Sequence, residues 1–228
     1  MQSELELIDY FGEFISDSKK ETIERVLGYR TRYITVVLEN IFQPHNASAV
    51  IRSCDCYGIQ DLHIIENDNE YVLNPNVTQG SSKWVDIYRY NDAANTNTLA
   101  CIDHLKSEGY EIYATSSHDS GFEVTELVPD HKMALLFGTE LTGLSQQALS
   151  HARKMIKIPM FGFTESFNLS VSVALCLQTL IDKLHQANIY WKLTDKERQQ
   201  LRLSWYRKSV RNSDILENAF YENRGGKK

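Results

Sequence analysis

The stretch MALLFGTELTGLS, residues 133–145, decides which fold we expect for this chain. Its first five residues are almost wholly apolar, which predicts a strand buried on both faces. That strand runs into Gly138, and Ser145 is suited to cap a helix that follows. A buried strand followed by a turn and a helix is the repeating unit of α/β proteins. The stretch therefore predicts a parallel sheet covered by helices.

Strands and helices alternate outward from this stretch in both directions. We predict strands at residues 34–38, 62–65, 85–88, 111–115, 133–137 and 155–158, and helices at 47–57, 99–107, 145–151 and 169–185. This alternation predicts an α/β fold with a mainly parallel sheet that is covered on both faces. Residues 33–187 are therefore expected to form one α/β domain.

The two ends of the chain are expected to be helical extensions of that domain, at residues 1–32 and 188–228. In the first, apolar residues from Leu5 to Ile15 recur at helical spacing. In the second, Thr194 precedes an acidic first turn, which favours the start of a helix there.

The composition is that of an ordinary globular protein. The 228 residues are 42% apolar and 24% charged, which excludes collagenous and mostly disordered chains. No apolar run reaches the roughly 18 residues of a membrane span, and no basic, apolar leader opens the chain. Four cysteines without a CxxC pair indicate neither a disulfide framework nor a zinc site. We expect a soluble, cytoplasmic protein that needs no metal.

The net charge of -6 is unevenly distributed. Residues 183–228 hold 11 Lys and Arg against 5 Asp and Glu, a balance of +6, which leaves -12 for the rest of the chain. Tryptophan and tyrosine are interleaved with these cations, and such a mixture can neutralise phosphates and stack on bases. The same pattern is also typical of a solvated amphipathic helix. The tail by itself does not decide between the two interpretations.

The first of three polar segments follows a predicted strand and reads NASAVIRSCDCYG, residues 46–58. Asn46 is suited to begin the helix, and Arg52 falls six residues later, about 240° around the helix axis. Asn46 could thus cap the helix while Arg52 packs toward a site. A structural cap with an ordinary surface arginine is the alternative.

The second and third segments also follow predicted strands. In the second, Gly138 and Glu140 form a GxExxG turn that lacks the lysine of a phosphate-binding loop, and its carboxylate would repel a polyphosphate. That carboxylate could hydrogen-bond a ribose or a backbone amide. The third, IKIPMFGFTESFNLSVSVALCLQTL at 156–180, places Ser166 and Asn168 before a long apolar helix, where either could be a plain cap.

Taken in this order, the three segments resemble the motifs of the SPOUT superfamily, specifically its SpoU branch of RNA 2′-O-ribose methyltransferases. The matching patterns are NxxxxxR, FGxExxGLS and IPMxGxxxSxNxSVA, spread over residues 46–174. A further match, GSSKWV at 80–85, and the flanking helices are most similar to the tRNA guanosine-18 2′-O-methyltransferases. RNA, and tRNA in particular, is the partner that this resemblance implies.

The resemblance also implies a fold and a cofactor. The family has an α/β fold with a deep trefoil knot in its C-terminal half, which is a rare feature in proteins. It binds S-adenosyl-L-methionine in the knot through backbone groups, which fall here near Thr115, Gly138, Ile158 and Phe167. Family members form homodimers through the knot region, and the long helix predicted at 169–185 suits such packing.

The catalytic set that the resemblance implies contains Arg52, Asn46, Glu140, Ser166 and Asn168. A sulfonium methyl group is already a good electrophile, so the protein has to align a ribose oxygen and manage one proton. The family assigns the proton to the motif arginine. A guanidinium, however, keeps its proton at neutral pH. Two roles therefore stay open for Arg52: the base, or a clamp on a phosphate beside the target ribose.

Three alternatives remain at this point. The motifs are shared with ribosomal RNA 2′-O-methyltransferases, although the short helical ends favour tRNA. A relative that binds RNA without catalysis is the second alternative, and the presence of the whole motif set argues against it. The third is a nucleotide-binding α/β domain whose motifs match by coincidence.

Overall fold

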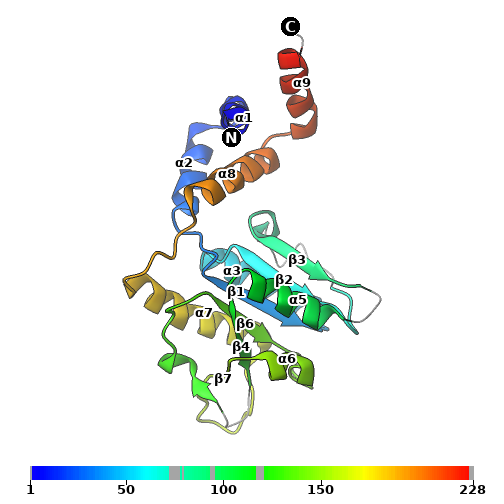
Figure 1. Cartoon of the computed structure of the whole chain (residues 1–228), viewed down its shortest axis with the longest axis vertical. Helices are drawn as coiled ribbons and strands as arrows, with labels where there is room; N and C mark the ends of the chain where they lie inside the picture. The colour runs from blue at the N-terminus through cyan, green and yellow to red at the C-terminus, as the bar shows by residue number, and fades with distance from the viewer. Residues whose placement is uncertain (1, 72–77, 79, 93–95, 117–120, 226–228) are drawn as a thin grey trace. The chain divides into compact units, whose positions relative to one another are not determined.

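The computed structural model describes residues 2–71, 78, 80–92, 96–116 and 121–225 (Figure 1). The chain divides into two compact units. One is the sheet unit, Thr31–Trp191, and the other is a helical unit formed by Met1–Arg30 together with Lys192–Lys228. The two ends of the chain thus fold together.

The sheet unit is built on a parallel sheet, as predicted. Within the described residues it has seven strands in the order β3-β2-β1-β6-β4-β7-β5, and every pair of neighbours is parallel. The strands are β1 (Ile34–Glu39), β2 (Asp61–Ile65), β3 (Asp86–Tyr90), β4 (Glu111–Thr115), β5 (Phe122–Glu123), β6 (Met133–Phe137) and β7 (Lys154–Lys157). Only the two-residue β5 has no counterpart in the sequence prediction.

Helices cover both faces of this sheet (Figure 1). They are α3 (Pro44–Cys56), α5 (Asn97–Ser107), α6 (Gln146–His151) and α7 (Leu169–Gln186), with short 3-10 turns η1 (Ser81–Lys83) and η2 (Val124–Glu126). Successive buried residues of β1 point to opposite faces. Val36 joins a core cluster with α3 and α7, whereas Val37 joins a second cluster with α5 and α6. The prediction that the sheet is covered on both faces is therefore confirmed.

The strand register brings the carboxyl ends of the central strands together. Leu38 of β1 pairs with Phe137 of β6, so both strands end at the same level. On the other side of β6, Thr115 at the end of β4 pairs with Ile156 of β7. Parallel α/β proteins place their ligands at such an edge.

The start of α3 differs from the prediction. The helix begins at Pro44 with Gln43 at the N-cap, so Asn46 lies inside the first turn and is not the cap. Proline suits the first helical position because its fixed φ is already helical and its missing N–H would have no partner there. The side chain of Asn46 is thereby released for another interaction.

The helical unit consists of α1 (Gln2–Gly12), α2 (Asp17–Leu27), α8 (Asp195–Ser209) and α9 (Ser213–Gly225). Thr194 caps α8 and forms a reciprocal capping box with Glu197, as the acidic first turn predicts. Arg30 is buried and lies over the ring of the buried Trp205, with 5.2 Å between its guanidinium carbon and the ring centroid. None of the helices in the described part of the chain has the length and apolar character that a membrane crossing requires.

Candidate active site

A chain of side-chain hydrogen bonds joins the three motif segments. The Asn46 Nδ2 group donates to Oε1 of Glu140, and Nδ2 of Asn168 donates to Oδ1 of Asn46 at 3.0 Å. Asn46 is only 5% exposed, so its amide is held between the other two side chains. Residues that are far apart in the sequence are therefore brought into direct contact at one point.

Asn168 has a second role at this point. It is the N-cap of α7, and its Oδ1 accepts hydrogen bonds from Ser170 N at 2.9 Å and from Ser170 Oγ at 2.7 Å. The amide oxygen thus caps the helix while the amide nitrogen binds Asn46. Asn168 is therefore a helix cap, and a different atom of the same side chain joins the hydrogen-bonded chain.

Glu140 is carried by a tight loop between β6 and α6. Thr139 N donates to Gly143 O at 3.2 Å and Gly143 N donates to Thr139 O at 3.0 Å, which closes the loop on itself. A Cβ atom on Gly138 would lie 2.2 Å from the carbonyl carbon of Gly143, so only glycine fits at the strand end. This close approach between Gly138 and Gly143 restricts the path of the loop that carries Glu140.

Three of the residues expected to bind the cofactor lie at the carboxyl ends of adjacent strands. Thr115 ends β4, Gly138 follows β6 and Ile158 follows β7. Thr115 Oγ1 donates to Leu136 O at 2.8 Å, which fixes its side chain against the neighbouring strand. The fourth, Phe167, is 39% exposed in the segment that precedes α7.

Arg52 and Ser166 are not part of the hydrogen-bonded chain. Arg52 lies on α3 with an exposed side chain, and no carboxylate pairs with it in the portion of the chain that the structure describes. Ser166 is exposed in the segment between β7 and α7. Both are therefore accessible to a binding partner.

Sequence analysis missed one polar residue at this edge of the sheet, the carboxylate of Glu39. This last residue of β1 is 2% exposed. Its Oε1 accepts hydrogen bonds from Thr98 Oγ1 and Ser145 Oγ, both at 2.7 Å, and its Oε2 accepts one from Ser145 N at 2.8 Å. The signal that points to it is an acidic side chain at the end of the otherwise apolar run ITVVLE.

The cations of the basic tail are partly neutralised within the helical unit. Arg202 pairs with Glu24, and this partner lowers the pKa of the Glu24 carboxyl. Arg207 makes two hydrogen bonds to the carboxylate of Glu217, at 2.7 and 2.6 Å. Lys208 and Arg211 near the end of α8 are exposed. The tail therefore offers fewer cations to a phosphate than its composition predicts.

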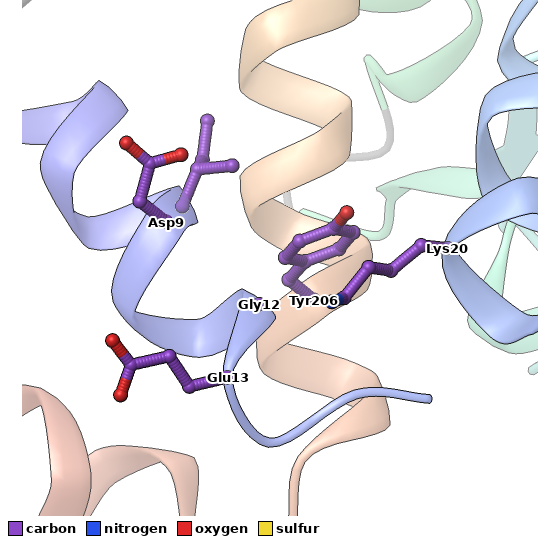
Figure 2. A pocket seen from close by; sticks show the side chains of 6 residues that line it. Asp9, Gly12, Glu13, Lys20 and Tyr206 are labelled. Carbon is purple, nitrogen blue, oxygen red and sulfur yellow. The ribbon is translucent and has the colours of Figure 1, made fainter. Parts of the chain in front are cut away.

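A shallow cavity of about 260 Å³ lies in the helical unit (Figure 2). It is lined by Ile8, Asp9, Gly12, Glu13, Lys20 and Tyr206. None of the residues predicted for catalysis or cofactor binding belongs to this lining, so the cavity is separate from the candidate active site.

Comparisons with known proteins find similar sequences and folds over most of the chain. Residues 33–178 match the model of the SpoU rRNA Methylase family. The chain is 45% identical over 214 residues to a tRNA (guanosine(18)-2'-O)-methyltransferase of Borreliella burgdorferi, covering 94% of this chain and 96% of that protein. It is 32% identical to the protein of the same name from Thermus thermophilus, over 85% of this chain and 98% of the relative.

Two solved structures are also similar to this chain in fold. The A. aeolicus TrmH/SpoU tRNA modifying enzyme is similar with a TM-score of 0.76 and 27% identity, over 86% of this chain and 98% of that one. The fold is also similar to that of the SpoU methyltransferase AviRb from Streptomyces viridochromogenes, solved with the cofactor AdoMet. The TM-score is 0.58 at 21% identity, over 69% of this chain and 63% of the other.

Proposed function

This chain belongs to the SpoU methylase family, and from that premise we propose that it methylates the ribose 2′-hydroxyl of guanosine 18 in tRNA. The methyl donor is S-adenosylmethionine. The observation that carries the proposal is the hydrogen-bonded chain from Glu140 through Asn46 to Asn168, which joins three separate segments at the carboxyl edge of the sheet. Two relatives at 45% and 32% identity bear the name of this activity.

The residues at this edge fit the donor. Thr115 ends its strand, and Gly138 and Ile158 directly follow the two adjacent strands, so the loops there offer backbone groups to a nucleoside side by side. Phe167 supplies a partly exposed aromatic ring for contact with the adenine. When bound, the cofactor supplies an electrophilic methyl group on a positively charged sulfur.

The polar residues then have to orient the ribose and accept one proton. With the cofactor bound, transfer of its methyl group would require the 2′-oxygen in line with the sulfonium carbon and an acceptor for the hydroxyl proton. Asn46, held between Glu140 and Asn168, cannot rotate freely, which suits a group that positions a substrate oxygen. We assign Ser166 to the same task, because it is exposed two residues before Asn168.

We propose that Arg52 holds a phosphate beside the target ribose. Its exposed side chain has no carboxylate partner within the described ranges, so its charge is available to an anion. A guanidinium presents several N–H donors in a plane that matches phosphate oxygens, and it does not give up its proton near neutral pH. Water or that phosphate then accepts the ribose proton.

We further propose a homodimer formed through the region around α7. Large apolar side chains are exposed in the single chain on α7, in the segment before it and in the loop after β6: Val171, Leu175, Phe161, Phe163, Phe167 and Leu141. Exposed apolar groups of this size are typical of protein interfaces when they lie together. We also propose that the chain forms the deep trefoil knot of the family. Its proposed location is the cytoplasm, together with its tRNA substrate.

The direct test is transfer of a labelled methyl group to tRNA and, separately, to ribosomal RNA. We expect label on the ribose of guanosine 18, with none in a tRNA transcript that carries a 2′-deoxyguanosine at this position. Label in ribosomal RNA with untouched tRNA would assign the other substrate class. Binding of tRNA without any transfer would indicate a relative that lacks catalysis.

A further inference from the structure

The buried carboxylate of Glu39 connects the end of the loop carrying Glu140 to the start of α5. It reaches Ser145, which ends that loop and caps α6, and it reaches Thr98 in the first turn of α5. Glu39 itself ends β1, beside the β6 strand from which the loop leaves. Both ends of the loop are therefore tied to the same strand pair.

The hydrogen bonds around Glu39 have a defined direction. Ser145 Oγ accepts from Ala148 N at 3.1 Å, and Thr98 Oγ1 accepts from Asn67 Nδ2 at 2.9 Å. Each hydroxyl thus donates its own hydrogen to Glu39. The third donor is the backbone N–H of Ser145, which cannot reverse. All three neighbours are donors, so the site requires an acceptor on both oxygens, which a carboxylate provides and an amide does not.

The burial of Glu39 indicates more than local packing. Within the described residues no lysine or arginine pairs with it, and a buried carboxylate held by three hydrogen bonds is costly to keep. A position at the N-terminus of α5 offsets part of this cost. A neutral side chain of similar size would avoid the cost of burying a charge. A carboxylate at this position therefore indicates that the hydrogen bonds it accepts from Ser145 and Thr98 are needed.

We propose that Glu39 is a positioning residue for methyl transfer: it anchors the loop of residues 138–145 so that its backbone receives the cofactor and Glu140 reaches Asn46. This inference rests on the proposed function, because it assigns the loop to S-adenosylmethionine. Glu39 is not assigned a contact with substrate or cofactor. It acts through Ser145.

The test is calorimetric titration of the purified protein with S-adenosylmethionine, well below the melting temperature. The variants are Glu39→Gln, Ser145→Ala and their combination. Thr98→Val is the matched control, since it removes one hydrogen bond to Glu39 without touching the loop. We expect Glu39→Gln and Ser145→Ala each to raise the cofactor Kd at least about tenfold, the factor for one charge-assisted hydrogen bond. Ser145→Ala keeps the backbone N–H bond to Glu39 and loses only the hydroxyl bond, so the effects should not add and the combination should be little worse than Glu39→Gln alone.

Thr98→Val should keep a Kd within about twofold of the original, even where its melting temperature falls. An equal loss of affinity in Thr98→Val and Ser145→Ala would overturn the proposal, because burial in general would then explain both. The proposal would also be overturned if Glu39→Gln lowered the melting temperature but left the affinity for S-adenosylmethionine unchanged. If Glu39→Gln does not fold, Ser145→Ala carries the comparison alone. Failure of the unaltered protein to bind S-adenosylmethionine would instead remove the proposed function itself.

Discussion

The side-chain amide of Asn46 donates a hydrogen bond to the carboxylate of Glu140, a residue 94 positions later in the chain. The oxygen of the same amide accepts from Asn168. Both ends of the amide are thus used, so its orientation is determined. The contact also links two motifs. It forms only when the helix after β1 and the loop after β6 are both in their native positions.

Replacing Asn46→Asp tests this relationship. The substitution sets one carboxylate against another in a site that is nearly buried, so we expect the Asn46–Glu140 contact to be lost. Methyl transfer to tRNA, measured with labelled cofactor, should fall by at least about 100-fold, which corresponds to about 3 kcal/mol of transition-state stabilisation.

The control combines Asn46→Asp with Glu140→Gln. This pair restores one donor and one acceptor with the direction of the hydrogen bond reversed, and it leaves an oxygen for Asn168. We expect it to recover a measurable part of the lost activity. If the combination is as inactive as Asn46→Asp alone, the amide of Asn46 or the carboxylate of Glu140 is needed for more than their contact with each other.

Arg52→Ala should separate substrate binding from cofactor binding. Because Arg52 is exposed and outside the hydrogen-bonded chain, its removal should abolish most turnover while calorimetry shows nearly unchanged S-adenosylmethionine affinity. Arg52→Lys keeps the charge but not the planar group, and should retain part of the activity. Equal loss of cofactor affinity in Arg52→Ala would show that the arginine belongs to the cofactor pocket.

The sequence was sufficient to predict the regular elements of the sheet unit. The apolar run of β6 and the long apolar helix α7 are strong periodic signals, and both lie where they were expected. The two residues of β5 are too few to give a pattern, and they become a strand only by pairing with β7. The start of α3 was missed because Asn46 was given the cap position, whereas Pro44 favours an earlier start.

The sequence predicts a set of site residues, but the contacts among them could not be predicted. Nothing local in the sequence states that Glu140 bonds Asn46, since this depends on how β1 and β6 align in the sheet. Local charge was misleading as well. Arg30 and Arg32 add to the local positive charge of the sequence, but Arg30 is buried against Trp205 and Arg32 pairs with Asp61. Such pairings depend on tertiary packing, so composition does not predict them.

Gly138→Ala should weaken cofactor binding through sterics alone. The added methyl group would meet the Gly143 backbone at 2.2 Å, so the loop has to move away from β6. We expect the Kd for S-adenosylmethionine to rise at least about tenfold. Gly162→Ala is the matched control, because its Cβ would approach no atom closer than 4.0 Å. A similar effect in both variants would contradict the steric explanation.

The exposed cations at the end of α8 should contribute to RNA affinity in a salt-dependent way. Each phosphate contact releases counterions, so the slope of log K against log salt should fall by about one for each cation removed. We expect a reduction of about two when Lys208→Ala is combined with Arg211→Ala. Lys132→Ala in the sheet unit, where Lys132 Nζ donates to Glu108 O at 3.0 Å, removes one positive charge and is the control for a single cation outside the tail. An unchanged slope in the double variant would exclude this part of the tail from the interface.

Finally, His63 on β2 should make folding stability dependent on pH. It is 3% exposed, its ring stacks on Tyr88 with centroids 4.8 Å apart, and its Nδ1 lies 3.1 Å from the Tyr90 hydroxyl. Burial, together with the nearby His104, lowers the pKa of His63 to about 3.

The sign follows from proton linkage. An unfolded histidine has a pKa of about 6.5, so below that pH the unfolded chain binds a proton that folded His63 excludes. Stability from this residue is therefore fully present above about pH 6.5 and is lost toward pH 3, by at most about 1.4 kcal/mol per pH unit. Between pH 7.5 and 5.0 it amounts to about 2 kcal/mol. Urea unfolding of the His63→Phe variant, which keeps an aromatic ring in the stack, tests this. Between pH 7.5 and 5.0, its free energy of unfolding should fall by about 2 kcal/mol less than that of the original protein. An identical pH dependence in both proteins would mean that His63 is accessible to protons in the folded state.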